Sequence, residues 1–424
     1  MNKKFKNSDH NFPLLDSSSR FLSKLFIGHL LFLIGILFFT PFKARGQATD
    51  LEIHSNPEKQ IYLFETNSKR DYYNVLIHNL ICINRSSHNI NIENLVIELV
   101  KDKQTVQTVI ISGDELASTA QRIKQMEQSG MLKLYDPFLR IIQVMKDTDR
   151  LSPNLQLAPN EAIVSMWHYL TFKGIPQFVK IRFIGEREDG KQVESHSQLR
   201  LIKYEQANEY IFPVKGVWFV AVSGDASTAH RWVLLEEFAL DLGQVDIKGK
   251  TYRKSGLTVE DYYCFNQDVV AVADGEVVFI QSGLPDDNTL LKQMDESDEA
   301  YGARLAMVQL KFLKENPYHA AGNYIVVRHS GNEYSHYAHL KQGSIKIKKG
   351  DQVKQGQVIG AVGHSGNSTE PHLHFSINDG VDFLTSVSLP VTFSNIKTFA
   401  REDQIYLHSG DIIQTKEIPQ NQAK

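Results

Sequence analysis

The stretch GHSGNSTEPHLHFSIN, residues Gly363–Asn378, joins a turn-forming segment to a short strand. Alternate side chains of a strand point to the same face. We therefore expect His372 and His374 to project together, while Leu373 and Phe375 face a core. The glycines and the proline of the first half are typical of a tight loop. The two histidines are suited to a metal ligand with a neighbouring proton carrier, although two polar residues on a solvated strand face would give the same pattern.

Three more motifs precede this stretch in a fixed order. A strand-turn-strand pattern covers residues 270–278, the strand end Tyr337-Ala338-His339-Leu340 follows, and a Lys/Gly-rich hairpin covers residues 347–357. Together with Pro371-His372-Leu373-His374-Phe375, this order resembles the lysostaphin/LytM-type zinc metallopeptidases, which cut the peptide part of the bacterial cell wall. The resemblance covers roughly residues 210–385. Several ordered motifs are far more specific than one of them alone.

The chain of 424 residues has room for two or three domains. We expect a mainly β protein, because runs at residues 72–83, 90–100 and 178–184 are rich in β-branched or aromatic residues. Residues 47–206 are interpreted as an immunoglobulin-like β-sandwich with a helical insertion near residues 114–128, which residues 139–145 would continue. The resemblance implies an all-β peptidase domain (a barrel-sandwich hybrid) at residues 207–390, followed by an extension at residues 391–424.

One segment departs from the family pattern. Residues 284–316 form a charged insertion in which Leu290, Leu291 and Met294, and then Leu305, Val308 and Phe312, recur at helical spacing. Such an insertion would stand beside the groove and limit which substrates enter. A solvated surface excursion would fit the same pattern.

The first 46 residues have the pattern of an export signal. Basic residues precede an apolar run from Leu25 to Phe42, and Ala44-Arg45-Gly46 offers small residues for a signal peptidase. An uncleaved membrane anchor is the alternative, because the apolar run is near the length that spans a bilayer. Either reading places the following domains outside the cytoplasm, in the periplasm or cell envelope.

Charge and cysteine content limit the partners. Residues 1–46 carry seven basic and two acidic residues, so removing them changes the net charge from −3 to −8. An acidic chain gains nothing from phosphate electrostatics, so we do not expect a nucleic-acid partner. The two cysteines, Cys82 and Cys264, are too few for a cysteine-based zinc site, and we interpret them as buried free thiols rather than a disulfide.

The resemblance implies a zinc ion held by one aspartate and two histidines. His374 matches the last ligand, and the strand Phe238-Ala239-Leu240-Asp241-Leu242 offers Asp241. Well-known members have a histidine four residues before the aspartate, where this chain has Glu237. His230, eleven positions before Asp241, is the preferred candidate, because a loop of that length costs little closure entropy. Family branches with this wide spacing carry a Tyr-Tyr-Cys-Phe segment, matched here by residues 262–265. Glu237 replacing His230 is the alternative.

The family assigns proton handling to two further histidines, matched by His339 and His372. Histidine is suited to this work because its pKa lies near the working pH. The sequence does not assign the base and the oxyanion-stabilising group between them. Four nearby histidines are interpreted as lying outside the site: His319, His329, His336 and His364.

The resemblance thus implies a zinc endopeptidase acting on peptide cross-links or stem peptides of peptidoglycan. Two other classes remain. A LytM-like protein that has lost ligands and activates a cell-wall amidase stays open as an alternative because of the wide spacing from His230 to Asp241. A biotinyl- or lipoyl-type carrier would share a related β-core, but the chain offers no single lysine at an exposed hairpin tip flanked as such domains require.

Overall fold

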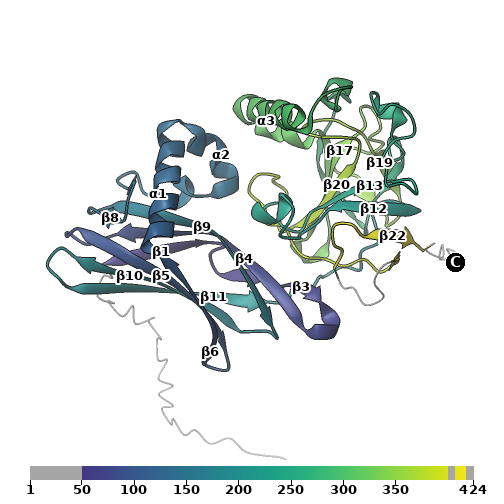
Figure 1. Cartoon of the computed structure of the whole chain (residues 1–424). Coiled ribbons are helices and arrows are strands. Elements are labelled where there is room, and N and C mark those ends of the chain that lie inside the picture. The colour runs from purple at the N-terminus through teal and green to yellow at the C-terminus, as the bar shows by residue number, and fades with distance from the viewer. Residues whose placement is uncertain (1–49, 400–405, 417–424) are drawn as a thin grey trace, which may run out of the picture. The chain divides into compact units, whose positions relative to one another are not determined.

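The computed structural model describes residues 50–399 and 406–416 (Figure 1). The described part is mainly β, as the sequence predicts, with three α-helices. The predicted export segment lies outside the described residues. Among the residues described, no helix is both long enough and apolar enough to cross a membrane.

The N-terminal half contains two β-sheets that share one core. The first sheet contains β1 (Leu51–Asn56), β3 (Phe64–Asn67), β4 (Tyr72–Asn84), β7 (Arg150–Leu151) and β9 (Glu161–Lys173). The second contains β2 (Gln60–Tyr62), β5 (Ile90–Lys101), β6 (Gln104–Ser112), β8 (Gln156–Leu157), β10 (Phe178–Arg187) and β11 (Gln192–Ile202). Residues such as Ile77 of β4 and Ile181 of β10 belong to the same buried cluster, so the two sheets pack as a sandwich. The three predicted strands are confirmed as β4, β5 and β10.

Two helices cover the outer face of the first sheet. Ile123 of α1 (Gly113–Gln128) and Leu132 of α2 (Met131–Leu139) pack against Ile81 and Val164 of the sheet. Strand β4 is therefore buried on both faces, which explains its nearly continuous apolar sequence.

The predicted helix at residues 114–128 is confirmed, but its continuation over residues 139–145 is wrong. The chain leaves α2 at Arg140, which is left-handed with φ 51°. The Asp136 carboxylate accepts hydrogen bonds from the next two backbone amides, and only a 3-10 turn at Ile142–Val144 follows.

The C-terminal half is built on a nine-stranded sheet. Its order is β18 (Gln352–Val353), β15 (Gly275–Gln281), β16 (Asn323–Arg328), β17 (Tyr334–Leu340), β20 (Leu373–Asn378), β13 (Leu240–Gly243), β12 (Val217–Val222), β22 (Ile412–Thr415) and β21 (Ile396–Thr398). A two-stranded sheet joins β14 (Asp268–Val270) to β19 (Val358–Ala361). Leu373 and Phe375 face the buried core of this half, as the alternation predicts.

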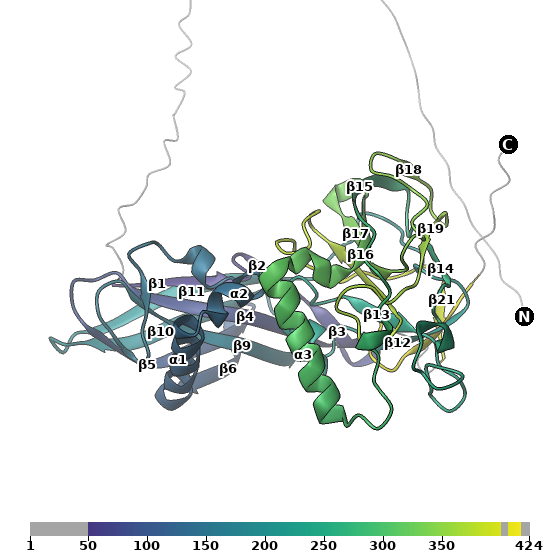
Figure 2. The same cartoon turned by 90° about the horizontal axis from the view of Figure 1, so that it is seen from above.

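The insertion at residues 284–316 forms a helix in its second half only. Helix α3 (Asp298–Glu315) is capped by Ser297, whose side chain accepts a hydrogen bond from the backbone amide of Ala300. The first half contains one 3-10 turn at Asn288–Leu290 in place of the expected helical repeat. Figure 2 shows α3 along its length, and α2 contacts it.

Candidate metal centre

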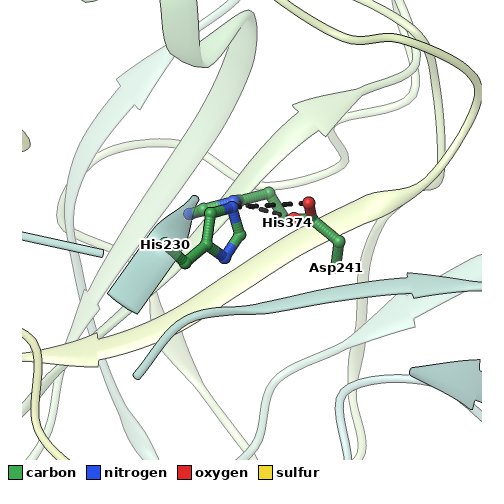
Figure 3. Close-up of side chains that lie close together, drawn as sticks. All are labelled: His230, Asp241 and His374. Atoms are coloured by element: carbon green, nitrogen blue, oxygen red, sulfur yellow. Dashed lines mark hydrogen bonds and ion pairs between the residues drawn. The ribbon is translucent and has the colours of Figure 1, made fainter. Parts of the chain in front are cut away.

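Three side chains from separate parts of the sequence meet at one end of strand β20. His374 lies on β20, Asp241 is its cross-strand partner on β13, and His230 begins a 3-10 turn at His230–Trp232. One candidate ligand atom from each lies within 4.8 Å of the others. The three side chains point toward one another in Figure 3. The eleven-residue separation of His230 from Asp241 is therefore compatible with a common site.

Hydrogen bonds orient these side chains. His230 Nδ1 lies 3.3 Å from the carbonyl oxygen of Ala239, so its Nε2 faces Asp241 Oδ2 at 3.4 Å. His374 presents the other ring nitrogen, with Nδ1 3.0 Å from Asp241 Oδ1. A carbonyl on the far nitrogen is the usual way in which proteins fix a metal-binding imidazole. The donor set of two imidazoles and one carboxylate fits a zinc ion with one coordination position left for water.

The Asp241 carboxylate is held in its charged form. Burial alone would raise the pKa of Asp241, but electrostatic interaction with the His230 and His372 rings and hydrogen bonds from His372 and His374 outweigh it. The pKa of this carboxyl consequently lies well below its usual range. A charged carboxylate surrounded by imidazole nitrogens is a suitable oxygen donor for a divalent cation.

The two predicted proton-handling histidines lie beside this cluster. The ring centroids of His339 and His372 are 4.8 Å apart, and His339 lies 5.9 Å from His374. His339 Nδ1 lies 2.8 Å from the carbonyl oxygen of Ser365, and His372 Nδ1 lies 2.7 Å from that of Glu370. Both rings therefore direct Nε2 rather than Nδ1 toward the site.

The environments of His339 and His372 shift their pKa values in opposite directions. Burial, together with electrostatic interaction with the neighbouring His372 and His374 rings, holds the pKa of His339 well below its usual value. Burial would also lower the pKa of His372, but the Asp241 carboxylate, whose Oδ1 lies 3.4 Å from His372 Nε2, raises it above its usual value. One ring is thus suited to accept a proton and the other to donate one.

The alternative ligand Glu237 is engaged elsewhere. Its carboxylate pairs with Arg231 and lies 3.1 Å from His78 Nε2 on β4. Among the histidines interpreted as lying outside the site, three bind other groups: His329 contacts Asp274 and Ser335, His336 contacts Gly380, and His364 contacts Ser368. None of these contacts involves a residue of the three-residue cluster.

A cleft of about 720 Å³ extends from the cluster across neighbouring elements. Its walls come from α1, α2, β9 and α3, including Ile123, Phe138, Trp167 and Leu313. Leu313 and Gln309 of α3 line this cleft, so the insertion stands beside the groove. The walls beyond the histidines are largely apolar, so the cleft offers bulky side chains as well as the polar cluster.

The loop that delivers His372 depends on contacts that the sequence did not reveal. Gly366 has φ +78°, and a Cβ there would lie 2.4 Å from the amide nitrogen of Gly322. Cys264 is a buried free thiol, as is Cys82, in agreement with the prediction. The Cys264 thiol donates to the Pro371 carbonyl, which ties the Tyr-Tyr-Cys-Phe segment to this loop. The presence of a cysteine at position 264 in the sequence did not by itself predict that hydrogen bond.

Comparisons with known proteins agree with the motifs. Residues 305–384 match the family model described as Peptidase family M23. The chain is 42% identical over 64 residues to the peptidoglycan DD-endopeptidase ShyA of Vibrio cholerae serotype O1, covering 15% of this chain and 14% of ShyA. It is 45% identical over 58 residues to the glycyl-glycine endopeptidase ALE-1 of Staphylococcus capitis, covering 13% and 16%. The chain thus spans less than a fifth of the length of these curated relatives.

Solved structures of this kind also match. The catalytic domain of lysostaphin from Staphylococcus simulans is 19% identical, covering 44% of this chain and 88% of that domain at a TM-score of 0.21. A zinc-containing peptidase from Vibrio cholerae is 13% identical, covering 74% and 80% at a TM-score of 0.23. The family match includes His339, His372 and His374, whereas His230 and Asp241 precede it.

Proposed function

We propose that this chain, which contains a peptidase family M23 domain of the lysostaphin/LytM type, is a zinc-dependent endopeptidase that hydrolyses peptide cross-links or stem peptides of bacterial peptidoglycan. The observation that carries the proposal is the convergence of His230, Asp241 and His374 beside a second pair of histidines. The substrate class rests on the relatives that are named peptidoglycan endopeptidases. The cell envelope is then the place of action.

The residues present would hold a zinc ion through His230, Asp241 and His374. Zinc bound by three protein ligands supplies a Lewis acid that lowers the pKa of water and polarises a carbonyl group. Other metals bind imidazole as well, but the mixture of two nitrogen donors and one carboxylate is common for catalytic zinc.

His339 and His372 would divide the proton handling between them. With Nδ1 on a backbone carbonyl and a lowered pKa, His339 is neutral and exposes the Nε2 lone pair to accept a proton from the attacking water. His372, whose pKa is raised, donates from Nε2 to the oxygen that becomes negative as the peptide carbonyl is attacked. The proton that His339 takes from the water is then available to protonate the leaving amine.

The cleft supports a peptide substrate. An extended segment running past β20 would bring its scissile carbonyl to the cluster and its neighbouring side chains to the apolar walls. The alternative of an inactive amidase regulator is less well supported, because it rested on the wide His230 spacing and the structure brings His230 within 3.4 Å of Asp241.

The test is metal content and hydrolysis in the same preparations. We expect about one zinc per chain, and digestion of purified peptidoglycan sacculi with release of new amino termini. His374→Ala and Asp241→Ala should abolish both zinc content and hydrolysis. His196→Ala, an exposed histidine on β11, is the matched control and should change neither. Hydrolysis by a folded, zinc-free His374→Ala protein would refute the proposal, and a zinc-free wild type that activates an amidase would favour the regulator.

A further inference from the structure

The loop between His230 and Asp241 contains a buried ion pair that the proposed chemistry does not use. Arg231 directly follows the first ligand and has none of its side chain exposed. Its guanidinium donates from Nη1 to the Glu237 carboxylate, and Glu237 stands four residues before Asp241. The pair therefore closes the loop on itself, with one ligand just outside each end.

Strand β4 of the sandwich completes the surroundings of this pair. Arg231 Nη2 donates to Asn74 Oδ1, and His78 Nε2 lies 3.1 Å from the other oxygen of Glu237. Asn74 and His78 are four residues apart on one strand, so they present side chains on the same face. Each member of the ion pair thus has one partner in the loop and one on β4.

Aromatic rings fill the remaining space around the guanidinium. Its central carbon lies 5.7 Å from the ring centroid of Phe64, 5.8 Å from that of Tyr169 and 5.3 Å from that of Phe238. Phe64 and Tyr169 belong to the sandwich strands β3 and β9, whereas Phe238 belongs to the loop. A guanidinium enclosed in this way has one low-energy position. If it moved away, the Glu237 carboxylate would be left buried without a compensating charge.

An ion pair buried this deeply is weak evidence for stability alone, because the cost of desolvating two charges offsets much of their attraction. Its placement suggests another role. Among the described residues of the loop, the His230 ring has one hydrogen bond, the 3.3 Å contact of its Nδ1 with the Ala239 carbonyl. The backbone that carries His230 is fixed one residue away, at Arg231.

We propose that Arg231 and Glu237 are positioning residues for the metal ligand His230, and that Asn74 and His78 of the sandwich hold them in place. The inference rests on the proposed metal site. It makes the sandwich a supporting part of the metal centre, in addition to any partner it binds. It also explains how a ligand eleven positions from Asp241 can be held as firmly as one on the same strand.

The experiment measures zinc affinity by chelator competition, together with the visible absorption spectrum of the Co²⁺-substituted full chain. Glu237→Gln keeps the shape of the side chain and removes its charge, and Asn74→Ala removes the sandwich partner of Arg231. For both variants we expect zinc affinity to fall by about 10-fold or more, the loss typical of groups that orient metal ligands. The Co²⁺ bands should shift, because the angle of the His230 ligand changes.

Leu80→Ala is the matched control, since Leu80 lies on the same strand but faces the sandwich core. It should lower the melting temperature while leaving zinc affinity and the Co²⁺ spectrum unchanged. The inference would be overturned if Leu80→Ala and Asn74→Ala, at equal melting temperature, lost the same zinc affinity. It would also be overturned if Asn74→Ala and Glu237→Gln both kept the wild-type zinc affinity. If Glu237→Gln does not fold, Asn74→Ala decides. A wild type that binds no zinc would instead refute the proposed function.

Discussion

At the scale of single residues, the two kinds of histidine in the site should separate cleanly by experiment. His339 and His372 keep their Nδ1 atoms on backbone carbonyls and lie next to the ligand cluster rather than in it. His339→Ala and His372→Ala should therefore retain about one zinc per chain and lose about 10²–10⁴-fold in kcat, the usual contribution of a positioned acid or base. The measurement is zinc content by mass spectrometry beside kcat on a synthetic stem peptide.

His230→Ala provides the contrast within the same experiment, because it should lose zinc and activity together. If His339→Ala lost zinc as completely as His230→Ala, the division between ligand and proton carrier would be wrong. A His372→Ala protein with unchanged kcat would remove that residue from the chemistry.

Much of this residue-level arrangement could be predicted from the sequence, for a local physical reason. Strand alternation alone predicts that His374 and Leu373 point to opposite faces of the strand, and the structure keeps that alternation. His230 was harder, because its approach to Asp241 depends on a loop whose course is set by the buried pair Arg231–Glu237. Burial of a charged pair cannot be deduced from the identities of its members, since both residue types are usually exposed.

At the scale of elements, the cleft walls belong to helices and strands that the peptidase motifs do not include. Trp167 on β9 is left-handed with φ 59°, and its Nε1–H donates to the Trp232 carbonyl at 3.3 Å. Its indole is 45% exposed and lines the cleft, so a ligand can still bury it. Trp167→Ala should lower kcat/KM by about 10-fold, mainly through a higher KM, because removing an aromatic contact costs about 1–2 kcal/mol.

Zinc content should stay near the wild-type value in Trp167→Ala, since Trp167 bonds Trp232 of the turn and none of the three cluster side chains. Ile110→Ala is the control and should leave KM unchanged, because Ile110 is an even more exposed apolar residue on β6 that does not line the cleft. An unchanged KM in Trp167→Ala would mean that the Trp167 side chain does not contact the substrate.

The elements show where sequence periodicity is a good guide and where it is not. Helix α1 was predictable because Leu116 and Ile123 recur at helical spacing and pack on the sheet. The first half of the insertion has a similar spacing, yet it forms one short turn around Leu290, which is anchored by the Asp287 side chain. Leu290 and Leu291 are buried although they form no α-helix, whereas α3 is helical over its whole length and buries only Leu313. Helical spacing alone therefore did not decide between turn and helix in this segment.

At the scale of the whole molecule, polar contacts join the described residues of the two halves, and both halves contribute walls to the cleft. Arg140 after α2 donates from Nη2 to the Ser386 carbonyl at 3.3 Å. Tyr204 and Tyr210 both donate to the Glu333 carboxylate, which anchors the segment that connects the sandwich to the nine-stranded sheet. Such long-range contacts were not predictable, because each joins residues more than 100 positions apart. A further set of such contacts joins the loop of the metal cluster to β4, through Arg231 with Asn74 and Glu237 with His78.

Zinc binding should therefore stabilise strand β4 although none of the proposed ligands lies on it. A ligand that binds only the folded state adds about 2.7 kcal/mol to the free energy of unfolding at a free concentration 100 times its Kd. We expect zinc to slow amide hydrogen exchange in β4, around Asn74 and His78, as well as in β13 and β20. In His374→Ala the zinc effect should vanish from all three strands. If the contacts through Arg231 and Glu237 couple the two parts, the stabilisation must reach β4. Slower exchange confined to β13 and β20 would therefore show that the sandwich opens independently of the metal centre.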